Sequence, residues 1–145
     1  MLTTFAHAEV TMASTTIPEK FLPVLTQKKA FANLATVMPD GTPQVTPVWF
    51  FYENGKFIVN TARGRVKDRN MTKNAAVAIS ISDPDNPYSH LSFRGKIVRV
   101  TEEGADAGID ALAKKYMGVD KYPMRSPGEV RVIYEIEPTS VSAMG

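Results

Sequence analysis

The stretch TPQVTPVWFFYENGKFIVNT, residues 42–61, contains two apolar segments joined by Asn54 and Gly55. An Asn-Gly pair between two such segments is a strong signal for a β-hairpin, because both residues accept the positive φ angles of a type I′ turn. The stretch therefore predicts two antiparallel strands, at residues 42–53 and 56–61.

The first of these strands is apolar on both of its faces. One face carries Val45, Pro47, Trp49 and Phe51, and the other carries Thr46, Val48, Phe50 and Tyr52. A strand with one solvated face would alternate apolar and polar residues, so both faces here must be covered. One face can fill a barrel interior, and the other needs a second subunit, a ligand or a helix. Because Pro43 and Pro47 cannot donate to a strand ladder, we expect an edge strand or a bulge here.

Outward from the hairpin, apolar segments and turn residues predict a small barrel. Further strands are expected at residues 30–38, 75–82, 91–101 and 130–144, with a bulge or bend at Gly95. Short helices are expected at residues 16–29, 65–74 and 102–118, and loops at residues 83–90 and 119–129. Hairpin-linked strands with a few small helices predict an α+β fold with an antiparallel sheet.

The bulk composition predicts one domain and excludes several kinds of site. We expect residues 1–16 to form a flexible tail and residues 17–145 to form a single domain, since 145 residues and 43% hydrophobic content suit one core. The absence of cysteine excludes disulfides and thiolate chemistry, and two distant histidines, His7 and His90, predict no metal site. With no apolar run near the roughly 20 residues of a membrane span and no signal peptide pattern, a cytoplasmic protein is expected.

Residues 60–70, NTARGRVKDRN, concentrate positive charge in a nearly neutral chain. Four cations and one acid, Asp68, give the stretch a net charge of +3, whereas the whole chain carries +2. Three interpretations are open: a solvated helix, a phosphate-bearing ligand held at a helix N-terminus, or nucleic acid. The segment from Arg63 to Arg69 contains no aromatic residue and the chain has no basic tail, so nucleic acid is disfavoured. The hairpin brings Val48, Trp49 and Phe50 near the end of the next strand, which favours a planar cofactor with a phosphate tail.

Four segments in order resemble the pyridoxamine 5′-phosphate oxidase-like split β-barrel proteins, and among them the branch that depends on coenzyme F420. These segments are FANLATVMPDGTPQVTPVWF (31–50), VNTARGRVKDRN (59–70), VAISISDPDNPY (77–88) and ALAKKYMGVDKYP (111–123). The resemblance covers roughly residues 17–138. It implies a six-stranded antiparallel split barrel, a homodimer, and two equivalent sites for FMN or F420 at the dimer interface.

The resemblance also implies a set of cofactor-binding residues. Asn60, Thr61 and Ala62 would lie beside the ring, and Arg63, Arg65 and Lys67 around the phosphate, with Asn70 as a weaker addition. Gln44, Val45, Thr46, Val48 and Trp49 match positions that line the ring or its ribityl chain. Ile79 and Ser80 would also belong to the site, together with residues near Tyr88 of the partner subunit.

The expected activity is hydride transfer between F420 and a small planar organic acceptor. The chain ends in EIEPTSVSAMG and lacks the Arg-Leu-x-Pro type segment of the vitamin oxidases, so that activity is not expected. Four cations favour the more acidic F420 over FMN. The alternatives are an FMN-binding oxidoreductase, a cofactor carrier or sensor without turnover, and a dimeric scaffold without a cofactor. No catalytic residue is identified, although Tyr88, His90, Lys121 and Tyr122 are candidates for a proton donor.

Overall fold

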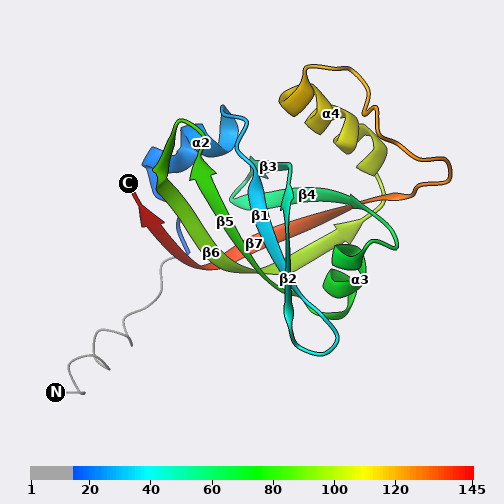
Figure 1. The fold of residues 1–145 in the computed structure, drawn as a ribbon, viewed down its shortest axis with the longest axis horizontal. Helices are drawn as coiled ribbons and strands as arrows, with labels where there is room; N and C mark the ends of the chain where they lie inside the picture. Colours follow the sequence, from blue (N-terminus) through cyan, green and yellow to red (C-terminus); the bar gives the residue numbers. More distant parts are fainter. Residues whose placement is uncertain (1–14) are drawn as a thin grey trace.

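The computed structural model describes residues 15–145, which form seven strands, three α-helices and a short 3-10 helix. The strands are β1 (Ala32–Val37), β2 (Pro43–Val48), β3 (Phe50–Glu53), β4 (Lys56–Ala62), β5 (Ala76–Asp83), β6 (Asn86–Thr101) and β7 (Arg131–Met144). The helices are η1 (Glu19–Phe21), α2 (Leu22–Thr26), α3 (Val66–Lys73) and α4 (Ala105–Met117). All the strand pairs are antiparallel, which confirms the predicted α+β class with small peripheral helices (Figure 1). Residues 1–14 of the predicted tail lie outside the described residues.

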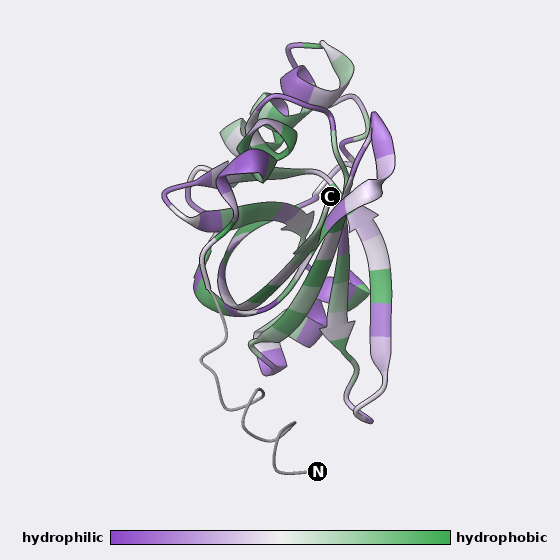
Figure 2. Ribbon diagram, turned by 90° about the vertical axis from the view of Figure 1, so that its left-hand side faces the viewer, coloured by the Kyte–Doolittle hydropathy of each residue, from purple (hydrophilic) through white to green (hydrophobic). Residues whose placement is uncertain are grey.

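The sheet closes into a barrel at Trp49. The strand order is β2-β1-β5-β6-β7-β4-β3, so β2 and β3 stand at opposite ends of the sheet. These two strands follow each other in the chain with only Trp49 between them, and the two edges therefore meet there. Figure 2 shows the strands curling around the interior, with α4 outside them.

The predicted single strand at residues 42–53 is therefore two strands, which raises the predicted six strands to seven. β2 pairs with β1 and β3 pairs with β4, so the chain has to bend where it passes from one partner to the other. The prolines lie on the edge strand β2, as predicted, where Pro47 lies opposite Asn33.

The Asn-Gly hairpin and the bulge at Gly95 are both confirmed. Asn54 and Gly55 have φ angles of 53° and 76°, and β3 and β4 pair on either side of them. The register of β6 against β7 shifts between Arg94 and Gly95. A Cβ atom at Gly95 would lie 2.9 Å from the carbonyl oxygen of Glu137, so the close approach of the two strands requires glycine here.

The predicted loop at residues 83–90 is wrong, because β5 and β6 continue into a tight turn between Asp83 and Asn86. The polar side chains that suggested a loop hold this turn. The Asp83 carboxylate accepts a hydrogen bond from the Asp85 amide at 2.9 Å and forms an ion pair with Lys28 at 2.8 Å. Polar residues at a hairpin tip thus satisfy the turn without ending the strands.

The two apolar faces of the bent strand are covered in different ways. Phe50 is fully buried in the barrel core, where its ring packs at 5.7 Å from that of Phe57. Trp49 and Phe51 pack instead against a separate cluster on α4. A helix, one of the three predicted kinds of cover, therefore protects part of the second face. Val45 remains 62% exposed.

Within residues 15–145, no helix is both long enough and apolar enough to span a membrane.

Candidate functional site

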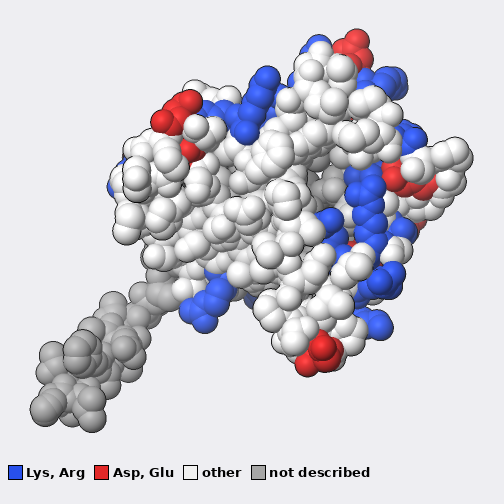
Figure 3. All heavy atoms as spheres, in the orientation of Figure 1, with Lys and Arg blue, Asp and Glu red and all other residues white. Residues whose placement is uncertain are grey.

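A cavity of about 190 Å³ lies beside the bend between β2 and β3. Its walls come from that bend, the end of β4, the start of α3, α4, the loop at residues 118–130 and the start of β7. The lining residues are Phe31, Pro47, Val48, Trp49, Asn60, Thr61, Arg65, Lys67, Ile109, Tyr122, Met124 and Arg131. Figure 3 shows lysine and arginine side chains gathered beside a hollow on the side of the molecule that carries α3 and α4.

The cavity carries a cluster of cations, because Arg65, Lys67 and Arg131 all line it. Within residues 15–145, Glu129 is the only carboxylate that forms an ion pair with any of the three. Its two oxygens lie 3.4 Å from Arg65 Nη2 and 3.2 Å from Arg131 Nη1. The cluster of these four side chains therefore carries a net charge of +2.

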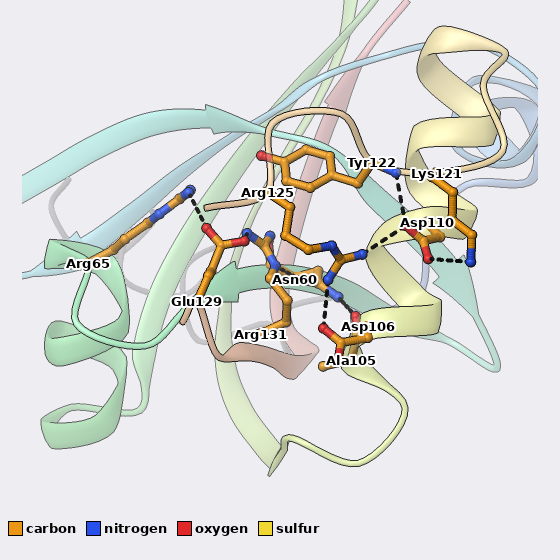
Figure 4. A network of polar contacts seen from close by, with 10 residues as sticks. All are labelled: Asn60, Arg65, Ala105, Asp106, Asp110, Lys121, Tyr122, Arg125, Glu129 and Arg131. Atoms are coloured by element: carbon orange, nitrogen blue, oxygen red, sulfur yellow. Dashed lines mark hydrogen bonds and ion pairs between the residues drawn. The ribbon is translucent and has the colours of Figure 1, made fainter. Parts of the chain in front are cut away.

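Arg131 is fixed in place by contacts on every side of its guanidinium group (Figure 4). Its side chain is only 2% exposed. Nε donates to Asn60 Oδ1 at 2.9 Å and Nη2 donates to the Asn60 carbonyl at 3.4 Å. The group also lies 5.1 Å from the ring centre of Tyr122, within the range of a cation–π contact. A buried cation with this many contacts is a rigid element of the cavity wall.

Unlike Arg131, Lys67 has no carboxylate among the described residues that balances its charge. Among residues 15–145 no carboxylate forms an ion pair with it. Burial lowers the pKa of Lys67, and the charges of Arg65 and Arg131 lower it further. A cation that is both half-buried and repelled by its neighbours would be stabilised by an anion in the cavity.

The start of α3 adds to the positive potential around Lys67. Lys67 lies in the first turn of the helix, where the helix dipole is positive, and no side chain caps that turn. The preceding residues are held by Asp68, whose carboxylate accepts from the Gly64 amide at 2.9 Å and from the Tyr134 hydroxyl at 2.6 Å. The local turn is thus built from within the chain, and Lys67 remains beside the cavity.

The cavity also has an aromatic wall. The ring of Trp49 stacks on that of Tyr116 at 5.2 Å and 5°, and it meets Tyr122 edge to face at 6.1 Å and 86°. Phe31 and Met124, about half exposed, add apolar surface at the rim. A cavity lined by both cations and aromatic rings suits a planar ligand with an anionic group.

Thr61 and Asn60, adjacent on β4, differ in what their polar atoms do. Thr61 is 1% exposed, and its hydroxyl has no hydrogen-bond partner among residues 15–145. Both polar atoms of the Asn60 side chain have a partner, since Nδ2 donates to the Ala105 carbonyl at 2.8 Å and Oδ1 accepts from Arg131. Gly108 allows this contact with α4, because a Cβ there would lie 3.2 Å from Asn60 Nδ2. Thr61 is therefore the residue of the pair with a free polar atom for a ligand.

The structure brings six of the fourteen predicted site residues to this cavity: Val48, Trp49, Asn60, Thr61, Arg65 and Lys67. Arg63 does not line it. Its Nε lies 2.8 Å from Glu102 Oε2 and its Nη1 lies 3.1 Å from Asp68 Oδ1, so two carboxylates already balance its charge. Ala62, its neighbour, is buried.

The remaining predicted residues lie on other surfaces. Val45, Ile79 and Ser80 line a second hollow of about 350 Å³ on the sheet. Asn70 is buried, and its Nδ2 donates to the Thr36 hydroxyl at 3.0 Å. The same hydroxyl donates to Gln44 at 3.2 Å. The Thr46 hydroxyl is buried and lacks a partner among residues 15–145.

Sequence reasoning missed several residues of the site, chiefly Arg131, Glu129, Met124, Ile109 and Phe31. Arg131 lies opposite Ala62 in the β4–β7 register, which places it beside the predicted basic stretch. An arginine directly before the apolar residues Val132 and Ile133 at the start of a strand is a signal that could have found it. Tyr122 was considered only as a proton donor in a loop, and it lines the cavity.

No group of three or more histidine, cysteine, aspartate or glutamate side chains that could hold a metal ion occurs in the part of the chain that the structure describes.

Comparison with known proteins identifies relatives of the whole domain. Residues 17–145 match the family model described as pyridoxamine 5′-phosphate oxidase. A solved structure named F420 reductase is 35% identical, with a TM-score of 0.76, and the match covers 87% of this chain and 98% of that chain. No curated protein matches the sequence significantly.

More distant solved structures share the fold. A conserved hypothetical protein from Mycobacterium tuberculosis is 19% identical, with a TM-score of 0.67, over 89% of this chain and 85% of its own. The heme storage protein HutZ from Vibrio cholerae is 17% identical, with a TM-score of 0.63, over 88% of this chain and 94% of its own.

Proposed function

Because this chain belongs to the pyridoxamine 5′-phosphate oxidase family, in its branch of F420-dependent proteins, we propose that it transfers a hydride between F420 and a small planar organic acceptor. Membership places it among flavin and deazaflavin oxidoreductases. The observation that carries the finer proposal is the cavity that both the unbalanced Lys67 and the Trp49 ring line.

The described residues fit such a cofactor. Lys67 and Arg65 would hold its phosphate, with Arg131 supplying fixed positive charge behind them. The unpartnered Thr61 hydroxyl would form a hydrogen bond to the ring or its ribityl chain, which removes the free-energy cost of an unsatisfied buried hydroxyl. Trp49 would provide an aromatic wall.

F420 is favoured over FMN by the 35% identity to a structure named F420 reductase. The sequence argument for an anionic ligand counted the cations of residues 60–70, but the cations that line the cavity are a different set. Arg63 is balanced by two carboxylates, whereas Arg131, distant in sequence, joins Arg65 and Lys67. Three cations against one glutamate suit the phosphate group that F420 and FMN share.

When bound, the cofactor supplies the hydride chemistry. The chain would orient it, keep water away and leave room for the acceptor. Of the four candidate proton donors only Tyr122 lines the cavity. Tyr88 is 81% exposed, and Lys121 forms a long ion pair with Asp110 at 3.8 Å. The proposal therefore gives Tyr122 a place beside the acceptor and assigns no catalytic role to the others.

We further propose that the protein acts as a homodimer. The cavity of about 190 Å³ is smaller than the roughly 300–1,000 Å³ of a typical small-molecule site. The exposed Val45 and the hollow that includes Ile79 and Ser80 offer a surface on which a second copy would enlarge the site.

Fluorescence titration with F420 and with FMN tests the proposal. We expect F420 to bind at micromolar strength or tighter, and more tightly than FMN. Oxidation of reduced F420 that depends on an added acceptor separates an enzyme from a carrier or sensor. Tighter binding of FMN would favour the flavin alternative, and binding of neither cofactor would contradict both.

A further inference from the structure

Glu129 occupies an unusual position for a carboxylate beside an anion site. Its side chain is 7% exposed, and its two oxygens contact two of the three cations of the cavity, Arg65 and Arg131. The Glu129 amide donates to the Ser126 carbonyl at 3.1 Å, which fixes the loop just before β7. The carboxylate is therefore held between the arginines by the fold.

The two arginines that Glu129 contacts differ in how freely their side chains can move. Arg131 is fully buried and bound by Asn60, so it cannot turn toward a ligand. Arg65 is 46% exposed, and its only ion pair among residues 15–145 is the 3.4 Å contact with Glu129. An incoming anion can therefore recruit Lys67 and Arg65, while Glu129 stays with Arg131.

We propose that Glu129 is a specificity residue that limits the site to a ligand with a single anionic group at this position. The inference rests on the proposed function only in taking the cavity as an anion site. With Glu129 ionised the cluster carries +2, which one phosphate nearly balances. A second phosphoryl group next to the first would have to approach the buried carboxylate, and this repulsion disfavours diphosphate ligands.

A purely structural role for Glu129, as the counter-charge of Arg131, makes a different prediction. If the carboxylate only positions Arg131, its neutralisation would disturb the wall and weaken the binding of every anion. If it repels a second anionic group, its neutralisation would strengthen anion binding, and most of all the binding of a diphosphate.

Calorimetric titration with sodium phosphate and sodium pyrophosphate tests the inference. The wild-type protein is expected to bind phosphate at least as tightly as pyrophosphate. In Glu129→Gln, which keeps the shape and a hydrogen-bond acceptor for Arg131, we expect phosphate to bind about threefold tighter and pyrophosphate about tenfold tighter. Glu135→Gln is the matched control. It removes one negative charge from β7 outside the cavity, where Glu135 pairs with Arg99 at 2.7 Å, and it should change neither affinity by more than about twofold.

If Glu129→Gln does not fold, Arg65→Gln supplies the test in the opposite direction. This half-exposed side chain lies outside the core, and its loss should weaken pyrophosphate about threefold more than phosphate. Equal changes for both anions, weaker binding in Glu129→Gln, or wild-type binding of neither anion would overturn the inference. Its failure is distinct from that of the proposed function, because the F420 and FMN titrations contain no diphosphate.

Discussion

Arg63 and Lys67 belong to one basic stretch, and the fold gives them opposite environments. Arg63 is paired with Glu102 at 2.8 Å and with Asp68 at 3.1 Å. The hydrogen bond to Glu102 is the main reason that the pKa of Arg63 is raised. This end of the stretch is therefore electrostatically satisfied within the chain.

At the other end, Lys67 has no carboxylate partner among residues 15–145, and burial is the main reason that its pKa is lowered. A run of positive charge therefore indicates a ligand site only where the fold leaves the charge unbalanced. The stretch thus divides into a structural half at Arg63 and a half at Arg65 and Lys67 that we propose binds the ligand, called the binding half below.

The largest expected effect comes from removing the binding half. Arg65→Ala combined with Lys67→Ala should weaken F420 binding by about 4 kcal/mol, since two charged hydrogen bonds to the ligand are lost. Fluorescence titration measures this change. The matched control is Arg63→Ala combined with Arg69→Ala, which removes the same charge from the same stretch and should change the affinity by less than about 0.5 kcal/mol. Similar losses of affinity in the two double variants would contradict the division of the stretch into a structural half and a binding half.

Alkaline pH should act on the same half. In the proposed site Lys67 would bind an anion in its protonated form. A bound anion would then raise the pKa of Lys67, and the full affinity is expected at neutral pH. Because burial and two arginines hold the pKa of free Lys67 below that of an exposed lysine, binding should begin to weaken at a lower pH than an ordinary lysine would cause. We expect a loss of about 2 kcal/mol, measured by titration across the alkaline range. Lys67→Arg should abolish this pH step, and its persistence would assign the step to another group.

Arg63→Ala tests whether Arg63 contributes to stability rather than to binding. Its loss should lower the free energy of unfolding by about 1 kcal/mol, because Asp68, only 7% exposed, loses one of its partners. Asp68 keeps the Gly64 amide and the Tyr134 hydroxyl, which limits the cost. Urea unfolding measures the stability, and unchanged stability with weaker cofactor binding would move Arg63 into the binding half.

Arg69→Ala should have the smallest effect. The side chain is exposed, and its Nη1 donates to the Gly64 carbonyl at 2.7 Å. Its removal should change both the stability and the affinity by less than about 0.5 kcal/mol. A larger loss of affinity would extend the binding half beyond Lys67.

Local chemistry made much of the fold predictable. The Asn54-Gly55 turn depends on two adjacent residues, and the edge position of β2 follows from its two prolines. The break at Trp49 was not predicted, because it depends on how far the sheet curls before its edges meet. The extension of β5 and β6 to Asp83 and Asn86 was missed because turn residues at a hairpin tip resemble those of a loop.

The site was predictable only where it is local in the chain. Arg65 and Lys67 stand in a visible cluster, and Trp49 lies one hairpin away. Glu129 and Arg131 come from a loop and strand more than sixty residues later, and only the β4–β7 register brings them near. The pairing of Arg63 with Glu102 is equally non-local, so the sequence could not show which cations were already balanced.

The apolar cluster of Ile109, Leu112 and Tyr116 is separate from the barrel core, and α4 lies between two glycines with left-handed backbone, Gly104 and Gly118. Such a unit can exchange its amide hydrogens by opening locally, at a lower free energy than global unfolding. Because α4 and its following loop form one wall of the cavity, a ligand that binds only the closed form would slow this exchange in α4 more than in β7. Ligand binding would then couple the stability of α4 to that of the barrel, and the slower amide exchange of α4 would measure this coupling.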